Sequence, residues 1–319
     1  MKILVTGGAG FIGSHFIRYL RQTYPDYTIT NLDCLAYAGN RENLCDVRED
    51  KQYTFIKGDI RDPKVVQRVM KTTDVVVNFA AQTHVDRSIA HAKDFIETNI
   101  NGTVTLLEAA RTCDIKKFIQ IGTDEVYGSV LEGSSIESDP LAPSSPYSAS
   151  KASADLLCHA YSLTYKLPVM ITRSSNNFGP FQYPEKVIPL FITNLLEGKK
   201  VPLYGDGMNV RDWIYVLDNV RAIDFILHQG EPSHIYNIGG GNEINNTDLT
   251  KLILSKFGLG AEWIEFVEDR AAHDRRYALD TGKIRHMGWK PLYDFGKSLE
   301  ATIDWYKANT KWWKKIKKS

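Results

Sequence analysis

The chain has 319 residues, of which 43% are hydrophobic and 24% are charged, and its formal net charge is +1. Such a chain can bury a substantial core in one or two globular domains. The nearly balanced charge argues against a nucleic acid or an anionic membrane as the main partner, and it leaves a small molecule as the expected ligand.

The cysteines and histidines indicate the redox state of the compartment and whether the protein binds a metal. The four cysteines have no CxxC spacing, and the eight histidines form no HxxxH or HExxH pattern, so we expect reduced thiols and no metal. No apolar run reaches the roughly 18 residues of a membrane helix, and the start "MKILVTGG" is too short for a signal peptide. These features predict a cytoplasmic protein without a membrane partner.

Short apolar runs alternate along the chain with longer stretches of helical periodicity. The runs span residues 3–6, 28–32, 53–56, 75–80, 118–121 and 169–172. One helical stripe comprises Phe11, Ile12, Phe16, Ile17 and Leu20, and a later one comprises Phe95, Ile96, Ile100, Val104 and Leu107. This alternation predicts an α/β fold with a parallel sheet covered by helices. After about residue 176, loops rich in Pro, Gly and Tyr indicate a ligand-facing region at the carboxyl edge of the sheet.

A glycine-rich turn, "VTGGAGFIGS", follows the first expected strand and opens the first expected helix. Gly7, Gly10 and Gly13 fit a GxxGxxG register, and Gly8 gives the alternative GxGxxG spacing. Such glycines let a pyrophosphate approach the backbone at a helix N-terminus. Asp33 ends the second strand 20 residues after Gly13, where a carboxylate can accept both ribose hydroxyls and repel a 2′-phosphate. The pattern favours NAD over NADP; the alternative is a glycine turn with an unrelated surface aspartate.

Two further strand ends are expected at the same edge of the sheet. Asp59 and Ile60 follow the third strand, and Ala80 and Ala81 follow the fourth. Asp59 could meet an adenine amino group, and the small alanines would let a cofactor pass. Each could equally be a helix cap or a packing residue.

The strand at 118–121 continues into "GTDEVYGS", which places Asp124 beside Glu125. Further on, "YSASK" spaces Tyr147 and Lys151 by one helical turn, so that they share a face. A tyrosine base needs its pKa to fall from about 10 toward 7, and a neighbouring ammonium pushes the pKa in that direction. YxxxK alone is common, but together with the glycine turn and Thr123 at a strand end it indicates hydride-transfer chemistry.

The motifs "GGAGFIG" and "YSASK", with Asp33, resemble the extended short-chain dehydrogenase/reductase superfamily. More narrowly, "LAYAGNRENL", "AAQTHVDRSI", "TDEVYG", "SNNFGPFQYPEKVIP" and "RDWIYV" look like the dTDP-glucose 4,6-dehydratase family, and the resemblance covers almost the whole chain. It implies a Rossmann-type doubly wound sheet and a smaller, discontinuous α+β domain. The implied NAD-binding domain comprises residues 1–175 plus about 213–240, and the substrate domain comprises about 176–212 plus 241–319.

The resemblance also implies a reaction. Tyr147, helped by Lys151 and Thr123, would take the proton of the hydroxyl on carbon 4 while hydride passes to NAD. Glu125 would then remove the proton on carbon 5, and Asp124 would protonate the departing hydroxyl of carbon 6. Hydride return to carbon 6 would regenerate NAD, which would stay bound between turnovers. Two neighbouring carboxylates in opposite protonation states suit these roles.

Further contacts follow from the same resemblance. Thr98 and Asn177 are implied at the cofactor. The implied substrate contacts are Thr83, Thr123, Asn176, Lys186, Val187, Pro202, Leu203, Tyr204, Arg211, Asn246, Arg270 and His273. Arg211 suits a diphosphate because a guanidinium binds phosphate oxygens bidentately. A homodimer is implied, built from the helix after Ser88 and the helix that starts near Tyr147.

One motif departs from the family pattern. The family usually has Asp-Arg-Pro-Gly-His where this chain has "DRAAH", with Ala271 and Ala272 in place of proline and glycine. The nucleotide base is therefore open, and a dehydratase of UDP- or CDP-glucose is the main alternative. A nucleotide-sugar 4-epimerase would need no acid pair, and a non-catalytic NAD sensor could lack the acids or Tyr147. The tail "KWWKKIKKS" is expected to dock its tryptophans on the body.

Overall fold

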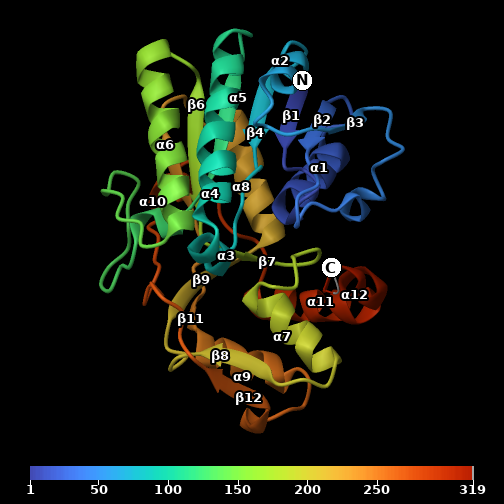
Figure 1. The fold of residues 1–319 in the computed structure, drawn as a ribbon, viewed down its shortest axis with the longest axis vertical. Coiled ribbons are helices and arrows are strands. Elements are labelled where there is room, and N and C mark those ends of the chain that lie inside the picture. Colours follow the sequence, from blue (N-terminus) through green and yellow to red (C-terminus); the bar gives the residue numbers. More distant parts are fainter. Residues whose placement is uncertain (318–319) are drawn as a thin grey trace.

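The computed structural model describes residues 1–317, and Figure 1 shows a larger body above a smaller one. Within this range the larger body contains a seven-stranded parallel sheet in the order β10-β6-β5-β4-β1-β2-β3. Its strands are β1 (Lys2–Thr6), β2 (Thr28–Asp33), β3 (Tyr53–Lys57), β4 (Val75–Asn78), β5 (Lys117–Thr123), β6 (Val169–Ser174) and β10 (Ile235–Ile238).

Helices cover both faces of this sheet. One face is packed by α1 (Phe11–Thr23) and α8 (Val216–Gln229), and the other by α2 (Pro63–Met70), α5 (Gly102–Arg111) and α6 (Pro146–Tyr165). The side chains of β1 alternate between the two cores, because Ile3 and Val5 belong to one cluster and Leu4 to the other. The predicted Rossmann-type doubly wound sheet is therefore confirmed.

Two sequence predictions need correction in detail. The fourth strand ends at Asn78, two residues before the end of the apolar run, because Phe79 and Ala80 leave the sheet. The second predicted helical stripe is wrong at Ile96, which is 48% exposed. Residues Ile96–Asn101 form a π-helix between α4 (Ala92–Phe95) and α5, and its wider turn shifts the buried face toward Asn99.

The smaller body has two short sheets. In the described part of the chain, β7 (Asn176–Phe178), β9 (Val210–Tyr215) and β11 (Glu243–Asn245) form one, and β8 (Val201–Tyr204) pairs with β12 (Ile264–Val267) in the other. They pack with α7 (Val187–Leu196), α9 (Asn246–Ser255), α11 (Phe295–Ala308) and α12 (Thr310–Lys317) around one core that includes Trp213 and Trp313. Short 3₁₀ helices span Arg41–Leu44, Asp124–Tyr127 and Ala261–Trp263.

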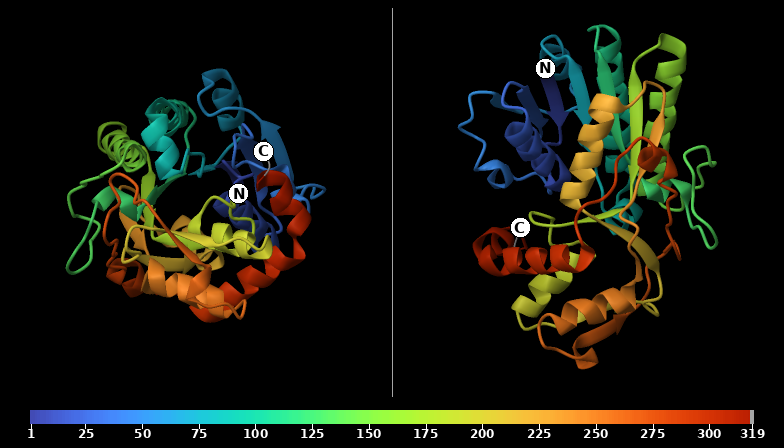
Figure 2. Two further views of the ribbon diagram at one scale, coloured as in Figure 1. Left: turned by 60° about the horizontal axis from the view of Figure 1, so that its bottom comes forward. Right: turned by 180° about the vertical axis from the view of Figure 1, so that it is seen from behind.

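The chain passes between the two bodies more than once. After β9 it returns to the sheet as α8 and β10, and later α10 (Gly282–His286) packs on β10 with Ile284 and Trp289 in the core of the larger body. Figure 2 shows these crossings from behind. The domain boundaries given above remain a prediction. The carboxyl ends of the parallel strands face the smaller body, which is where open α/β folds bind ligands.

Candidate active site

A cavity of about 530 Å³ lies at the carboxyl edge of the sheet. It collects predicted residues from distant segments of the chain. Those on its wall are Gly7, Gly10, Phe11, Ile12, Gly13, Asp33, Asp59, Ile60, Ala80, Ala81, Thr83, Thr98, Thr123, Asp124, Glu125, Tyr147, Lys151, Asn176, Asn177 and Lys186. The remaining predicted contact residues lie outside this lining.

The glycine turn forms one end of the cavity. Gly7 has a φ of 67°, and a Cβ there would lie 2.6 Å from the backbone nitrogen of Ala80. A Cβ at Gly13 would lie 2.6 Å from the carbonyl oxygen of Gly7, and Gly10 is the N-cap of α1. Only glycine fits such close approaches. The turn thus presents bare backbone at a helix N-terminus, which is a site for a phosphate group.

Asp33 closes β2 beside this turn and is 6% exposed. Its Oδ2 accepts from the Ala9 amide at 2.9 Å and its Oδ1 from the Leu35 amide at 2.7 Å. Burial raises the pKa of Asp33, and the two backbone hydrogen bonds offset part of the rise. The carboxylate therefore lies on the cavity wall where the sequence places a ribose-binding group.

Two carboxylates follow β3, and they have different roles. Asp62 caps α2, because its Oδ1 accepts from the amides of Lys64 at 2.9 Å and Val65 at 3.3 Å. Asp59 lines the cavity and pairs with Arg61 at 2.6 Å. Asp59 is therefore not the helix cap that the sequence allowed as its alternative.

The acid pair lies at the end of β5. Thr123 caps the short 3₁₀ helix Asp124–Tyr127; its hydroxyl accepts from the Glu125 amide at 3.3 Å and donates to Asp124 Oδ1 at 3.2 Å. Asp124 is 3% exposed and its Oδ2 has no hydrogen-bond partner within the described residues. Burial, followed by the charge of Glu125, raises the pKa of Asp124 well above its usual range.

Glu125 differs from its neighbour in the charges around it. Burial raises the pKa of Glu125 too, but Lys186, Arg270 and Arg211 act against the rise. Asp124 has weaker compensation, with Arg211 as its main favourable charge. The site therefore favours a protonated Asp124 beside an ionised Glu125.

Tyr147 and Lys151 lie on the first turns of α6. Pro146 and a capping box between Ser145 and Ser148 start this helix, and Tyr147 is 7% exposed. Burial and the charge of Glu125 raise the pKa of Tyr147 well above its usual range, and a hydrogen bond with Thr123 opposes the rise. The charge of Lys151 does not outweigh this rise; its ammonium donates to the Ile121 carbonyl at 2.5 Å.

Lys186 approaches Glu125 from the loop before α7. Its Nζ donates to the Thr83 carbonyl at 2.8 Å, and burial lowers its pKa while the charges of Glu125 and Glu185 oppose the fall. Asn177 is held from another direction, since its Oδ1 accepts from the Asn219 amide group at 2.8 Å. Both side chains are thereby fixed at the cavity wall.

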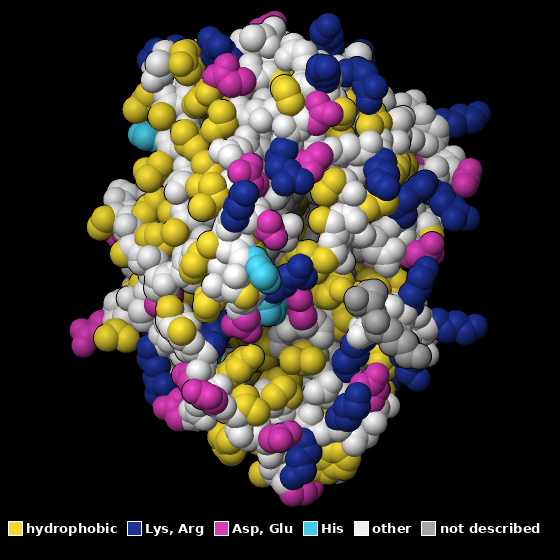
Figure 3. Space-filling model, viewed as in Figure 1, with side chains coloured by type: hydrophobic (Ala, Val, Ile, Leu, Met, Phe, Trp, Pro, Cys, Tyr) yellow, Lys and Arg dark blue, Asp and Glu magenta, His cyan; other side chains and the backbone are white. Residues whose placement is uncertain are grey.

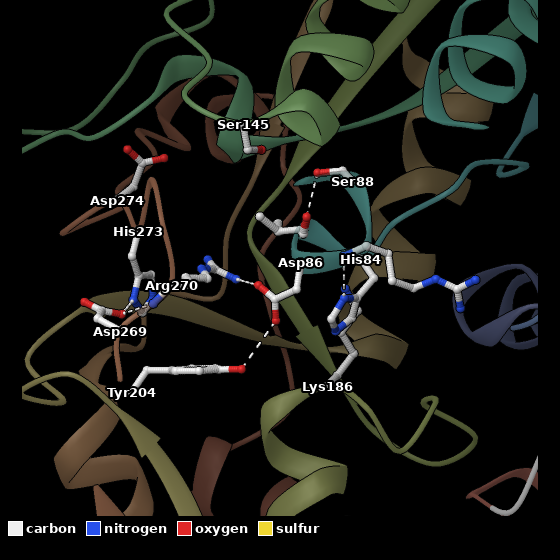
Figure 4. A network of polar contacts seen from close by, with 12 residues as sticks. His84, Asp86, Ser88, Ser145, Lys186, Tyr204, Asp269, Arg270, His273 and Asp274 are labelled. Carbon is white, nitrogen blue, oxygen red and sulfur yellow. Dashed lines mark hydrogen bonds and ion pairs between the residues drawn. The ribbon is translucent and has the colours of Figure 1, made fainter. Parts of the chain in front are cut away.

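A second polar cluster lies outside the cavity lining and includes Tyr204, Arg270 and His273. Figure 4 shows Asp86 of α3 (Val85–Ala90) between two of them: it accepts from the Tyr204 hydroxyl at 3.4 Å and pairs with Arg270 at 3.8 Å. His273 Nδ1 donates a hydrogen bond to Asp269 Oδ1 at 2.6 Å. The charge of Arg270 still reaches Glu125, so this cluster is coupled electrostatically to the acid pair.

The other predicted substrate contacts occupy the smaller body. Arg211 is 5% exposed; its guanidinium donates to the carbonyls of Val210 at 2.7 Å and Asp274 at 2.9 Å. Leu203 is 1% exposed and packs inside. Val187 begins α7, Pro202 lies in β8, and Asn246 begins α9.

The segment "DRAAH", which differs from the family's usual sequence, has an unusual backbone conformation at one residue. Ala272 has a φ of 52°, which is the left-handed region that favours glycine. The backbone therefore keeps a path that a glycine would adopt without strain, although alanine is disfavoured there by roughly 1–2 kcal/mol. The side chains of Arg270 and His273 still reach the cluster described above.

The residues at or near the site that the sequence reasoning missed include Glu185, Asp86 and Asn99. Glu185 and Asp86 stand inside the quoted motifs "YPEKVIP" and "HVDRS", where attention to every charged residue would have found them. Asn99 gave no signal, because its role depends on the π-helix. Its Nδ2 donates to Ser150 Oγ at 2.8 Å and its Oδ1 accepts from the Gln82 amide at 2.8 Å, which ties the cavity wall at Gln82 to α6.

The GDP-mannose 4,6 dehydratase family model matches residues 4–302. The chain belongs to this family. A low-salt glycan biosynthesis protein, Agl12 of Haloferax volcanii, is 52% identical over 306 residues, which cover 96% of this chain and 98% of that protein. A dTDP-glucose 4,6-dehydratase of Streptomyces antibioticus is 50% identical, with 100% of this chain and 96% of that protein covered.

A solved structure agrees with these sequence matches. The dTDP-glucose 4,6-dehydratase of Streptomyces venezuelae, solved with NAD and dTDP bound, is 50% identical and superimposes with a TM-score of 0.97. The match covers 99% of this chain and all of that one (100%). The resemblance inferred from the motifs is thereby confirmed.

Proposed function

We propose that this protein converts dTDP-glucose to dTDP-4-keto-6-deoxyglucose. The reaction comprises oxidation at carbon 4, elimination of water across carbons 5 and 6, and reduction at carbon 6, with NAD regenerated in each turnover. The observation that supports it best is the placement of Asp124 and Glu125 on the same cavity wall as Tyr147 and Lys151. Such a site has one pair of groups for oxidation and another for loss of water.

The glycine end of the cavity fits NAD. A Cβ at Gly10 would meet only the Gly7 carbonyl oxygen, at 3.2 Å, so the backbone at the N-terminus of α1 is open to a pyrophosphate. Asp33 can accept from ribose hydroxyls. We assign to the cofactor site Gly7, Gly10, Phe11, Ile12, Gly13, Asp33, Asp59, Ile60, Ala80, Ala81, Thr98, Tyr147, Lys151 and Asn177. When bound, NAD supplies the hydride acceptor for carbon 4 and the hydride donor for carbon 6.

Tyr147 removes the proton of the hydroxyl on carbon 4, and Thr123 holds that hydroxyl. Burial keeps the phenol neutral at rest. Lys151, whose ammonium is fixed by the Ile121 carbonyl, supplies a positive charge one helical turn away on the same face. Its charge stabilises the phenolate to which the phenol must ionise before it can accept the proton of the carbon 4 hydroxyl.

The ketone at carbon 4 makes the proton on carbon 5 acidic. Glu125, whose ionised form is favoured by the charges of Lys186, Arg270 and Arg211, removes this proton. Asp124, kept protonated by burial and by the charge of Glu125, gives its proton to the hydroxyl that leaves carbon 6. After reduction at carbon 6, Glu125 returns the proton to carbon 5. Tyr147 then releases to solvent the proton that it took from the carbon 4 hydroxyl, and Asp124 takes up one proton from solvent, which restores the starting protonation states.

The region next to the acid pair is suited to a nucleoside diphosphate, because the charges of Arg211 and Arg270 reach Glu125. Arg211 and Arg270 provide guanidinium groups for the two phosphates, and β8 offers apolar surface for a base. The proposed substrate contacts are Thr83, Thr123, Asn176, Lys186, Val187, Pro202, Leu203, Tyr204, Arg211, Asn246, Arg270 and His273. The thymidine base follows from the dTDP-glucose relatives described above.

We also propose a homodimer formed by α3, α6 and the π-helix between them. Large apolar side chains on these elements are exposed: Ile89 45%, Ile96 48%, Leu156 58% and Leu163 54%. Figure 3 shows hydrophobic side chains gathered over α6 on one face of the molecule. An exposed apolar patch of this kind is typical of a protein interface.

A cytoplasmic location is proposed as well. Support comes from the four cysteines, which are free thiols, as in proteins of reducing compartments. None of the helices within residues 1–317 is both long and apolar enough to cross a bilayer.

A substrate comparison tests the proposal. The purified protein is incubated separately with dTDP-, UDP- and CDP-glucose, and the sugar products are identified by NMR. We expect loss of water from dTDP-glucose at a rate well above the other two. Faster turnover of UDP- or CDP-glucose would overturn the base assignment, and a galactose product would favour a 4-epimerase. Absence of any product from a protein that binds NAD would favour the sensor alternative.

A further inference from the structure

The C-terminal helix α12 lies beneath α1 and close to the glycine turn (Figure 1). The tail that forms it has no part in the proposed reaction. Its two tryptophans do not behave alike: Trp313 is fully buried in the core of the smaller body, whereas Trp312 is half-buried and reaches across to the larger body. The second contact is the one that bears on the cofactor site.

A chain of hydrogen bonds leads from Trp312 to the dinucleotide turn. The Trp312 indole N–H donates to Asn43 Oδ1 at 3.0 Å, and Asn43 Nδ2 donates to the Ala9 carbonyl at 2.9 Å. The Ala9 amide in turn donates to Asp33 Oδ2 at 2.9 Å. Asn43 is 1% exposed and Ala9 is fully buried. Ala9, which lies between Gly8 and Gly10, is therefore held through its amide by Asp33 and through its carbonyl by Asn43.

The same indole also packs against another residue of the cavity lining. Its ring lies 5.8 Å from that of Phe181, which lines the cavity and has a φ of 63°. His15 of α1 donates to the neighbouring Pro180 carbonyl at 2.9 Å. Trp312 thus contacts both Asn43, which supports the glycine turn, and Phe181 of the cavity lining.

We propose that Trp312 is a positioning residue for the cofactor: through Asn43 it fixes the Ala9 peptide and thereby slows the release of bound NAD. The inference rests on the proposed function, since it concerns the cofactor of that site. It predicts an effect on cofactor retention and none on the chemical steps, because neither residue lies on the cavity wall beside Tyr147 or the acid pair.

The test compares Trp312→Phe, Asn43→Ala and the double variant with wild type. Trp312→Phe keeps an aromatic ring against Phe181 and removes the indole donor. The matched control is Trp263→Phe, because Trp263 is also half-buried and packs on the core of the smaller body, away from the cavity. Each protein is loaded with NAD, freed of unbound cofactor and sampled over time for NAD that remains bound.

We expect NAD release to be about fivefold faster in Trp312→Phe, as the loss of one partly buried hydrogen bond implies, and unchanged in Trp263→Phe. With saturating NAD, kcat should stay within about twofold of wild type. Because both residues act through one chain of bonds, the double variant should release NAD no faster than Asn43→Ala.

A wild-type rate of NAD release in Trp312→Phe would overturn the inference. So would a double variant whose increase in release rate equals the product of the increases in the two single variants. If Trp312→Phe does not fold, the test rests on Asn43→Ala. NAD release from Asn43→Ala at the wild-type rate would then contradict the inference. These failures leave product formation from dTDP-glucose intact. Failure of the proposed function is seen separately, as the absence of that product from wild-type protein loaded with NAD.

Discussion

Glu125 lies directly beside Asp124 at the end of β5, and its charge adds to burial in raising the pKa of Asp124 well above its usual range. Lys186, Arg270 and Arg211 act against the same rise at Glu125. The two carboxyl groups are thus held in unequal environments, although they are neighbours in the sequence. Unequal environments are what an acid and a base need in order to work in the same site.

Replacing the proposed acid should separate oxidation from loss of water. In Asp124→Asn the amide cannot protonate the leaving hydroxyl, so elimination should slow by about 100-fold or more, as expected for the loss of a general acid. Stopped-flow absorbance should show NADH that forms and then decays slowly. Asp304→Asn, at an exposed position, should behave like wild type. Loss of oxidation in a folded protein with bound NAD would contradict the assigned role of Asp124.

Removing the proposed base should stabilise the fold as the pH rises. Asp124 holds its proton more tightly in the folded protein than in the unfolded chain, so stability falls as the pH rises from the unfolded pKa toward the folded pKa. Without the charge of Glu125 that fall is smaller. Urea unfolding of Glu125→Gln at several pH values should give a gain over wild type that grows with pH. Glu132→Gln, at an exposed position, should show no such gain.

The loop at Ala272 offers a test by stability. Its φ of 52° favours glycine, so Ala272→Gly should raise the free energy of unfolding by up to about 1 kcal/mol. Ala271→Gly is the matched control, and it should be neutral or destabilising because that residue gains flexibility only in the unfolded chain. Equal effects of the two substitutions, measured by urea unfolding, would show that the strain at Ala272 is absent in solution.

Asn99 should be important for stability even though it lies away from the chemistry. Truncation in Asn99→Ala removes the bond to Ser150 and leaves the Gln82 amide without its acceptor, which should cost about 2–3 kcal/mol. Asn101→Ala removes only an exposed bond to Glu97 and should cost well under 1 kcal/mol. A thermal denaturation series that ranked the two variants equally would refute this role.

The fold could be predicted because its signals are local. Each signal depends on residues that are near one another in the sequence: the apolar runs of the strands, the apolar stripe on α1, and the spacing of Gly7, Gly10 and Gly13. All three features are found in the structure. The π-helix could not be predicted, because an apolar spacing of three to four residues does not reveal an extra residue in a turn. Its presence displaced Ile96 to the surface and brought Asn99 inside.

The sequence could predict those site residues that lie in motifs at the ends of strands, because these strand ends meet at one edge of the sheet. The cavity contains the acid pair, Tyr147 and Lys151 together, as the motifs indicate. What the sequence could not supply is the direction of the pKa of Tyr147, since that depends on burial and on the distance to Glu125. Nor could it place Asp86 against Tyr204 and Arg270, because these three residues come from separate segments.

The central claim is that one protein oxidises carbon 4, eliminates water through the acid pair and returns the hydride internally. The most direct measurement is turnover of dTDP-glucose in heavy water, followed by NMR of the product and by absorbance. We predict dTDP-4-keto-6-deoxyglucose with solvent deuterium at carbon 5 and no net accumulation of NADH. A product without deuterium at carbon 5, a simple galactose epimer or a stoichiometric build-up of NADH would contradict the account.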